Sequence, residues 1–317
     1  MATCGLIHGG CCLNVALLGS VSSSRHALAA LIDSHVHVTA VLGLDPGRGE
    51  NVADFHDLAP LALRAGLPYL SFVKVTEPQV EQFLRDHRPD LLWVIGISQL
   101  VPQRLIDVAS AGAVGFHPTM LPRGRGRAPV AWTILLGERA AVSLFYLTEE
   151  ADRGDIIAQR EVPVMPGDYS QDLIDRTNEV LADVIRELAP SIKSGVLPRF
   201  PQDERRATYY KKRTAADGLI CWTDSAEKIE RLIRAASRPY PGAFAYWGAV
   251  KVTCWRGHVL SLADTPAPAH SPGEVVAVTE NRSIIVATGN GCVEITELDG
   301  ENVDQLPVGA RLTVEPL

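Results

Sequence analysis

The sequence lacks the features that mark membrane, secreted or nucleic-acid-binding proteins. No apolar run in its 317 residues reaches the roughly 18 residues of a membrane-spanning helix, and residues 1–13 have neither the basic region nor the long apolar core of a secretory signal. The net charge of −7 disfavours nucleic-acid binding, which depends on Lys and Arg neutralising phosphates. These absences predict a cytoplasmic enzyme or binding protein without a membrane partner.

Cysteine is sparse and follows no metal or disulfide pattern. The six cysteines include no Cys-x-x-Cys pair, and the group of Cys4, Cys11 and Cys12 with His8 has the spacing of no standard metal site. We therefore expect residues 1–13 to be a disordered leader, the thiols to be reduced as in the cytoplasm, and no metal to be bound.

The first predicted strand-to-helix turn lacks the glycine fingerprint of dinucleotide-binding proteins. Where Gly-x-Gly-x-x-Gly would stand, after a strand at 14–18, the sequence has Gly19-Ser20-Val21-Ser22-Ser23-Ser24. These serines can cap the following helix or hold a small anion at its N-terminus, and capping is the more common role.

Short apolar runs nevertheless alternate with helical patterns over residues 14–200. This alternation predicts an α/β catalytic domain with a mostly parallel, Rossmann-like sheet and helices on both faces. Ligands of such sheets lie beyond the carboxyl ends of strands. The expected strands are 14–18, 36–42, 69–73, 91–97, 113–117, 141–148 and 155–164. The expected helices are 24–32, 57–64, 79–85, 103–109, 130–136 and 174–188.

A charged segment separates this region from a second predicted domain. Residues 201–218 contain Asp203-Glu204-Arg205-Arg206 and Lys211-Lys212-Arg213, which is typical of a linker. Beyond them a short helix at 226–235 precedes only strands, which turn signals separate at close intervals. Residues 219–317 are therefore expected to form a small OB-like β-barrel.

Two polar residues at predicted strand ends are the best candidates for chemistry. His117 ends an apolar strand and enters a loop of Pro, Gly and Arg, and Asp152 lies in a loop between two strands. An imidazole can stabilise an oxyanion or move a proton, and a buried carboxylate beside it can orient the ring. We expect the two to share one active site, in preference to a core histidine and a capping aspartate.

The motifs around these residues resemble those of the folate-dependent formyltransferases. That family's signature is Asn-x-His-x-Ser-Leu-Leu-Pro, then Arg-Gly, then an Asp-x-Gly-Asp or similar loop. This chain has Gly115-Phe116-His117-Pro118-Thr119-Met120-Leu121-Pro122, then Arg125-Gly126, then Asp152-Arg153-Gly154-Asp155. Residues 209–214 and 239–244 are also similar to the C-terminal half of the UDP-aminoarabinose formyltransferases.

The resemblance implies formyl transfer from 10-formyltetrahydrofolate, with His117 and Asp152 as the catalytic pair. Backbone groups at two strand ends grip the pterin in the family, and the matching positions here are Ser98, Gln99, Leu100, Val101, Leu147 and Asp152. Guanidinium groups suit phosphate or carboxylate recognition, and three candidates for substrate binding stand near the histidine: Arg123, Arg125 and Arg127.

One family residue is missing from the motif. The Asn two positions before the histidine, whose amide donates to the formyl oxygen, is Gly115 here, and loss of such a donor typically costs about 10²–10³ in rate. Ser98, Gln99 or Thr119 could supply a donor instead. It is also possible that water fills the gap, that the reaction has changed, or that activity is lost; retained acyl transfer is the preferred interpretation.

The expected acceptor is a small amine, and an amino sugar on a nucleotide fits the arginine loop best. A methionyl-tRNA formyltransferase would need a basic loop near the site, whereas residues 45–50 are close to neutral.

The same motifs are compatible with a 10-formyltetrahydrofolate deformylase, with formyl transfer to an amino acid or siderophore amine, and with a non-catalytic folate or nucleotide sensor. The resemblance also implies a homodimer.

Overall fold

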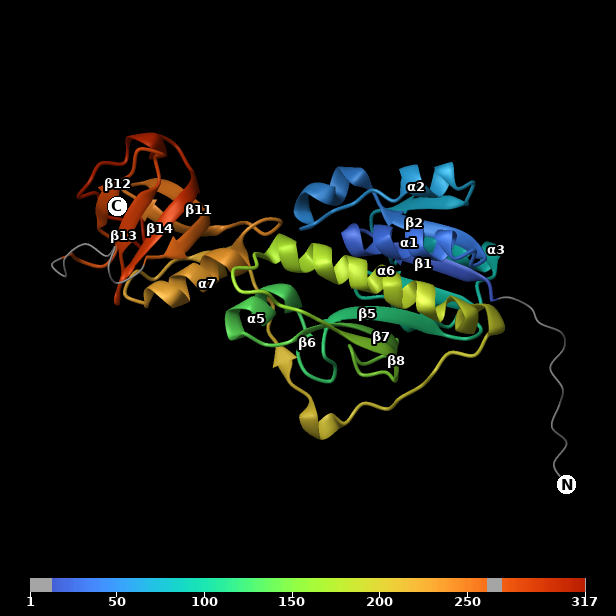
Figure 1. Cartoon of the computed structure of the whole chain (residues 1–317). Helices are drawn as coiled ribbons and strands as arrows, with labels where there is room; N and C mark the ends of the chain where they lie inside the picture. The colour runs from blue at the N-terminus through green and yellow to red at the C-terminus, as the bar shows by residue number, and fades with distance from the viewer. Residues whose placement is uncertain (1–12, 261–269, 317) are drawn as a thin grey trace, which may run out of the picture. The chain divides into compact units, whose positions relative to one another are not determined.

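The computed structural model describes residues 13–260 and 270–316, which form two compact units (Figure 1). The first unit comprises Met1–Arg125, Ala140–Val162 and Arg176–Tyr209, and the second comprises Gly126–Arg139, Pro163–Asp175 and Tyr210–Leu317. The expected leader and its cysteine group lie outside the described residues, except for Leu13. The units interleave along the chain, and the domain boundaries at 200 and 218 stay predictions.

The first unit contains a seven-stranded, mostly parallel sheet, which confirms the predicted fold class. Its order is β3-β2-β1-β4-β5-β7-β8, with the first five strands parallel and the last two antiparallel to their neighbours. The strands are β1 (Val15–Gly19), β2 (Val38–Leu44), β3 (Tyr69–Phe72), β4 (Leu91–Ile95), β5 (Ala113–Thr119), β7 (Ala140–Tyr146) and β8 (Ile156–Val162).

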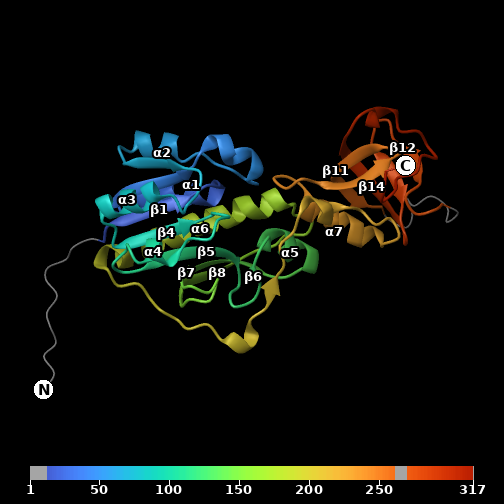
Figure 2. The same ribbon diagram turned by 180° about the vertical axis from the view of Figure 1, so that it is seen from behind.

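Helices cover both faces of this sheet because its strands are apolar on both sides. Leu18 and Leu42 share a buried cluster with Leu84 of α3 and Leu105 of α4, and burial of each such side chain contributes about 1.5–3 kcal/mol. Figure 1 shows α1 and α6 over one face, and the view from behind in Figure 2 shows α3 and α4 over the other. The helices are α1 (Ser22–Asp33), η1 (Pro46–Asn51), α2 (Ala59–Arg64), α3 (Pro78–His87), α4 (Gln103–Ile106), α6 (Ser170–Ser194) and η2 (Glu204–Arg206).

The serines after β1 close the turn into α1 with hydrogen bonds inside the protein. The Ser24 hydroxyl is fully buried; it accepts from the main-chain nitrogens of Ser20 at 3.0 Å and Val21 at 3.2 Å. It donates to the carbonyl oxygen of Ile95 at 2.6 Å. This arrangement favours capping over anion binding, because the hydroxyl has its partners within the chain.

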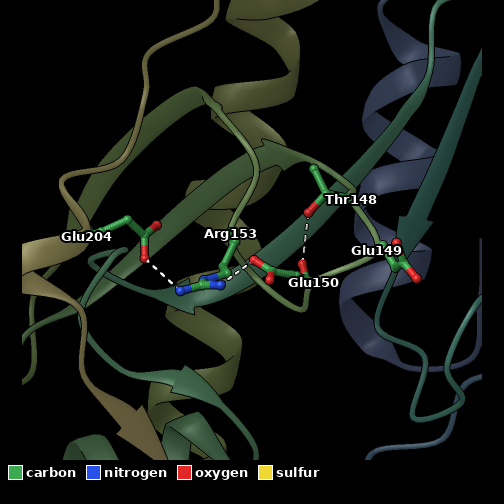
Figure 3. A pocket seen from close by; sticks show the side chains of 5 residues that line it. All are labelled: Thr148, Glu149, Glu150, Arg153 and Glu204. Carbon is green, nitrogen blue, oxygen red and sulfur yellow. Dashed lines mark hydrogen bonds and ion pairs between the residues drawn. The ribbon is translucent and has the colours of Figure 1, made fainter.

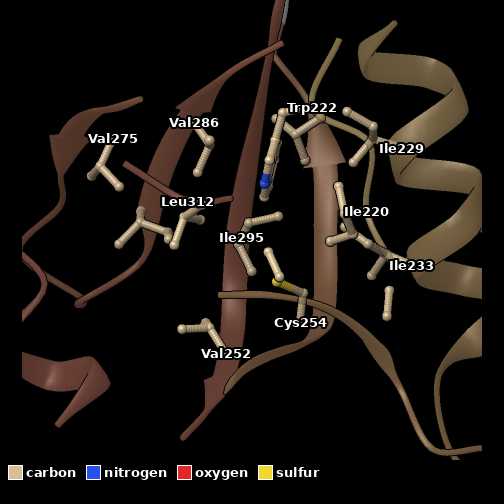
Figure 4. Close-up of a cluster of buried hydrophobic side chains, with 14 of the residues drawn as sticks. Ile220, Trp222, Ile229, Ile233, Val252, Cys254, Val275, Val286, Ile295 and Leu312 are labelled. Carbon is tan, nitrogen blue, oxygen red and sulfur yellow. The ribbon is translucent and has the colours of Figure 1, made fainter. Parts of the chain in front are cut away.

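The second unit consists of helices α5 (Pro129–Leu136) and α7 (Ala226–Ala236) and an antiparallel half-barrel sheet in the order β10-β11-β14-β13-β12. Figure 4 shows its core, in which Trp222 and Ile233 pack with Cys254 and Ile295. The remaining elements are η3 (Ala215–Gly218), β10 (Ala243–Trp247), β11 (Val250–Val259), β12 (Val275–Val278), β13 (Ile284–Ala287), β14 (Cys292–Asp299) and η4 (Val303–Gln305).

Across the described ranges, no helix combines the length and the apolar character that crossing a bilayer requires.

Candidate active site

His117 lies near the end of β5 and is almost completely buried, with 6% of its surface exposed. Its Nε2 lies 2.8 Å from the carbonyl oxygen of Gly124. A carbonyl oxygen only accepts, so we assign the ring hydrogen to Nε2, which leaves Nδ1 of the neutral ring as an acceptor. The loop after β5 therefore determines which nitrogen of His117 can take up a proton.

Asp152 brings a carboxylate to the free nitrogen of this ring. Its Oδ1 lies 3.8 Å from Nδ1 of His117, and its side chain is 16% exposed. Because β7 is antiparallel to β5 and its last residue, Tyr146, pairs with Val114, the loop after β7 must return along β5 to reach the histidine. The return requires a left-handed backbone at Asp152, with φ +59°, and a glycine at 154, where a Cβ would lie 1.7 Å from a carbonyl oxygen.

A pocket of about 410 Å³ opens beside Asp152, at the carboxyl end of β4. Its walls are mainly apolar, and they include Gly115 and five of the six residues that were predicted to bind folate. Ser98 is exposed and does not line the pocket. The residues that line it are Val94, Gly96, Ile97, Gln99, Leu100, Val101, Pro102, Gln103, Ile106, Gly115, Phe116, Phe145, Leu147, Thr148, Glu149, Ala151 and Asp152.

The pocket also presents backbone groups to a ligand. Leu100 and Val101 lie between β4 and α4, and their main-chain N–H and C=O groups have no hydrogen-bond partner among residues 13–260 and 270–316. Such groups can bind the polar edge of a flat ring system that the apolar walls enclose.

Gly115 lines the pocket at a point where neighbouring side chains fill the space that a side chain at position 115 would need. A Cβ at this position would lie 2.6 Å from Cδ2 of Leu147 and 2.9 Å from Cζ of Phe145. Phe145 is buried, with 2% exposure. An asparagine at 115 would therefore require both apolar side chains to move.

The three residues that could replace the missing amide donor differ in their surroundings. Gln99 accepts from the Val75 nitrogen at 2.8 Å and donates to the Val73 oxygen at 3.0 Å, so both ends of its amide are used. The Thr119 hydroxyl donates to the Arg123 oxygen at 2.8 Å. Ser98 and Thr119 do not line the pocket, whereas Gln99 does, and its Nε2 carries a second hydrogen besides the one that Val73 accepts.

The three arginines after the histidine have different environments. Arg125 is fully buried, and its two terminal nitrogens bind the carboxylate of Glu204 at 2.9 and 2.7 Å and reach Tyr209 and Gln202. Arg123 and Arg127 are exposed, and within the described part of the chain their guanidinium groups have no partner. The guanidinium of Arg125 is therefore committed within the protein, whereas those of Arg123 and Arg127 face solvent.

The Arg125–Glu204 contact shifts both groups toward their charged forms. Hydrogen bonding from Arg125 is the main cause that lowers the pKa of the Glu204 carboxyl, and the same bond is the main cause that raises the pKa of Arg125. Glu204 also pairs with Arg153 at 3.1 Å, beside Asp152. Figure 3 shows this contact in a second, acidic pocket of about 470 Å³, lined by Thr148, Glu149, Glu150, Arg153 and Glu204.

Sequence reasoning missed two residues that touch the site. Gln202 donates through Nε2 to the carbonyl oxygens of Asp152 at 2.9 Å and Gly154 at 2.7 Å. Thr208 accepts at Oγ1 from the Gly124 nitrogen at 2.8 Å. Both lie in the segment interpreted as a linker, and no local pattern distinguishes them, since their partners are 48 to 84 residues away.

The described residues contain no group of three or more His, Cys, Asp or Glu side chains that could hold a metal ion.

Solved structures of formyltransferases and of a related protein share this fold. HypX from Aquifex aeolicus, in complex with tetrahydrofolic acid, is 20% identical with a TM-score of 0.66, over 90% of this chain and 44% of HypX. This chain thus spans less than half the length of HypX. The sugar 3N-formyltransferase WlaRD, studied with dTDP and 5-N-formyl-THF, is 15% identical with a TM-score of 0.62, over 92% of this chain and 99% of its own.

An N-formyltransferase from Helicobacter canadensis, in complex with folinic acid and dTDP-3-aminofucose, is 14% identical with a TM-score of 0.60, over 89% of this chain and 98% of its own. Two family models match the sequence directly. The formyl transferase model matches residues 13–187, and the model of the formyl transferase C-terminal domain matches residues 212–310. The motifs, the two folded units and these matches agree, and the chain belongs to the formyl transferase family of enzymes.

Proposed function

We propose that this protein transfers a formyl group from 10-formyltetrahydrofolate to the amine of a small acceptor, an amino sugar linked to a nucleotide. The observation that carries the proposal is the position of Asp152. Its carboxylate lines the 410 Å³ pocket and lies 3.8 Å from Nδ1 of His117. A ligand in that pocket would therefore meet the Asp152 carboxylate, with the His117 ring next to it.

The pocket has the chemistry that a folate requires. Its apolar walls suit a flat ring system, and the backbone groups of Leu100 and Val101 are available to the polar edge. Tetrahydrofolic acid, 5-N-formyl-THF and folinic acid accompany the three similar structures, which supports the same class of co-substrate here. When bound, 10-formyltetrahydrofolate supplies a formyl group on a nitrogen that can leave.

His117 and Asp152 would move the proton that this exchange of carbon–nitrogen bonds requires. The acceptor amine loses one proton as its nitrogen bonds to the formyl carbon, and Nδ1 of His117 is the acceptor for it. The Asp152 carboxylate stabilises the resulting imidazolium, and the proton passes from Nδ1 to the departing nitrogen. The Gly124 carbonyl holds Nε2 and leaves Nδ1 facing the Asp152 carboxylate.

A nucleotide-linked amino sugar fits the exposed arginines after the histidine. Arg123 follows His117 by six residues, and its guanidinium is solvent-accessible, as phosphate recognition requires. Two similar structures contain dTDP or dTDP-3-aminofucose, which supports an acceptor of this class. A homodimer, a cytoplasmic location and closure of the C-terminal sheet into an OB-like barrel stay predictions from the sequence and its resemblance.

A deformylase is the second candidate, and Gly115 is the observation that favours it. The wall near His117 has no amide at position 115, and the Thr119 hydroxyl is committed to the Arg123 oxygen. Water could then take the place of the amine as nucleophile, with Asp152 and His117 accepting its proton. A non-catalytic sensor would have no use for such a pair.

Release of tetrahydrofolate from 10-formyltetrahydrofolate tests the proposal, measured with and without dTDP-linked and UDP-linked amino sugars. Release that depends on the amine, with a formylated sugar found by mass spectrometry, is the expected result. Equal release without amine would identify a deformylase. Binding of the folate without release would identify a sensor, and the Asp152→Asn variant provides the background rate in every arm.

A further inference from the structure

We infer that residues 202–208 act as a clamp that positions both members of the His117–Asp152 pair. Gln202 holds the loop that carries Asp152, and Thr208 holds the backbone that orients the His117 ring. The inference rests on the proposed function, and it assigns positioning residues to a segment that has the composition of a linker.

Gln202 acts on the aspartate. Asp152 has φ +59°, in the left-handed region of the backbone, which a non-glycine residue keeps when its surroundings hold it there. The Gln202 side chain supplies such a restraint, because its one nitrogen donates to the Asp152 oxygen at 2.9 Å and the Gly154 oxygen at 2.7 Å. It therefore bridges two carbonyl groups of the turn.

Arg125 determines which way the Gln202 amide points. The Gln202 oxygen accepts from Nη2 of Arg125 at 2.8 Å, so the amide nitrogen must face the Asp152 turn. Arg125 is itself fully buried and held by the Glu204 carboxylate, two residues after Gln202. A buried charged group with a bidentate partner has little freedom to move, so it fixes this orientation.

Thr208 acts on the histidine. The Gly124 oxygen accepts from Nε2 of His117, so the backbone on either side of Gly124 sets the ring's orientation and tautomer. Thr208 holds that backbone at three points: its Oγ1 accepts from the Gly124 nitrogen at 2.8 Å, its carbonyl oxygen accepts from the Arg125 nitrogen at 3.0 Å, and its nitrogen donates to the Pro122 oxygen at 3.2 Å. A side chain that touches no reacting atom thus controls which nitrogen of His117 takes the proton.

The two contacts come from one short segment, so they are mechanically linked. Gln202 and Thr208 flank the single turn η2, and Glu204 in that turn anchors the segment to Arg125. A displacement of the segment would disturb the histidine and the aspartate together. Such coupling matters because a misplacement of about 1 Å at a catalytic group can cost about 10²-fold in rate.

The test uses the full chain with matched substitutions. Thr208→Val keeps the shape and removes the acceptor, whereas Thr208→Ser keeps the hydroxyl. Gln202→Glu keeps the oxygen that faces Arg125 and replaces the donor nitrogen with a second oxygen. Arg205→Gln is the control in the same segment, because the Arg205 side chain is 90% exposed and, among residues 13–260 and 270–316, pairs with Asp203 alone.

The first readout needs no substrate. In protein labelled with ¹⁵N-histidine, the ring nitrogen shifts report which nitrogen carries the hydrogen, and the His117→Gln variant identifies the signal. We expect the Nε2–H form in the unmodified protein and in Thr208→Ser, and a mixture of both tautomers in Thr208→Val. An unchanged signal in a folded Thr208→Val variant would overturn the role of Thr208.

The second readout separates positioning from stability. We expect Thr208→Val and Gln202→Glu to lower kcat for formyl transfer about 10–100-fold, with the KM for 10-formyltetrahydrofolate within about twofold and the unfolding temperature near that of Arg205→Gln. Loss of activity only in proportion to loss of folded protein would overturn the inference. Absence of transfer in the unmodified protein, with the tautomer change still seen in Thr208→Val, would instead refute the proposed function.

Discussion

The Nδ1 atom of His117 lies 3.8 Å from the Oδ1 atom of Asp152, although 35 residues separate them in the chain. This distance exceeds that of a hydrogen bond, and contacts between catalytic groups often shorten only when substrate binds. The other ring nitrogen is already committed to Gly124 at 2.8 Å. Nδ1 is therefore the ring nitrogen of His117 that can accept a proton, and it faces Asp152.

Removing the charge of Asp152 should stop turnover without unfolding the protein. Asp152→Asn keeps the shape of the side chain but cannot stabilise an imidazolium, and we expect kcat to fall about 10²–10⁴-fold. His117→Gln should have a similar effect. Because residues that act as a unit are non-additive, the double variant should be no slower than the worse single one. The test is to measure the steady-state rates and the unfolding temperatures of the three variants. A double variant whose loss of kcat equals the product of the two single losses would contradict this prediction.

Restoring an asparagine at position 115 should disturb packing before it affects chemistry. A Cβ there meets Leu147 at 2.6 Å and Phe145 at 2.9 Å, so Gly115→Asn should lower the free energy of unfolding by about 1–3 kcal/mol. Adding Leu147→Ala to Gly115→Asn opens the space, and the double variant should recover part of that loss. Chemical denaturation of both variants and of Leu147→Ala tests this. A Gly115→Asn variant as stable as the unmodified protein would contradict it.

Arg125 should matter for stability rather than for the acceptor. Arg125→Lys cannot form both bonds to Glu204, and the buried site would hold a less satisfied charge. We expect the free energy of unfolding to fall by about 1–3 kcal/mol, with the KM for the amine acceptor within about twofold. A large rise in that KM, in a stable variant, would return Arg125 to a substrate-binding role.

Arg123 should matter for binding of the acceptor rather than for stability. Its side chain is exposed, so Arg123→Gln should change the free energy of unfolding by less than about 0.5 kcal/mol. If it binds a phosphate of the acceptor, its loss should raise the KM for a nucleotide-linked amine about 10-fold, because a hydrogen bond to a charged group contributes about 1.5–3 kcal/mol. The KM for 10-formyltetrahydrofolate serves as the control and should not change.

The core of the second unit should weaken in alkali through Cys254. Complete burial raises the pKa of its thiol to about 12 from 9.0 (Figure 4). Between these values the unfolded chain loses the proton and the folded one keeps it, so stability is intact below pH 9 and falls as pH rises, by up to about 1.4 kcal/mol per pH unit.

Cys254→Ala isolates this effect from other titrating groups. The variant should be less stable than the unmodified protein at pH 7, by about 1 kcal/mol, because it loses buried contacts. The difference should shrink or reverse as the pH rises from 9 to 11. Urea unfolding at several pH values measures it, and a difference that stays constant across this range would show that the thiol does not titrate as its burial predicts.

Several parts of the site could be derived from the sequence because they depend on local patterns. Alternating apolar runs placed the strands of the parallel sheet and the histidine at the end of one, as the structure confirms. The motifs around His117 and Asp152 identified the family, which the family models confirm. Residue type and near neighbours along the chain were enough for these conclusions.

Other parts depend on contacts between distant residues, which no local pattern encodes. Thr119 carries a donor, yet its hydroxyl bonds to the Arg123 oxygen and the residue does not line the pocket. Arg125 stands in a motif that was expected to bind substrate, but it is buried against Glu204, 79 residues away. Residue type alone cannot distinguish a free donor from a committed one.

By itself, the sequence determined the α/β fold followed by a β unit, the family, and the chemical identity of the pair at His117 and Asp152. The tertiary structure decided how these two side chains are placed. The return of the loop after β7 brings Asp152 to Nδ1, and Gly124 directs the other nitrogen away. The reason is physical: side-chain chemistry and periodicity are local properties, whereas distance, burial and the choice of hydrogen-bond partner arise only when separate segments pack together.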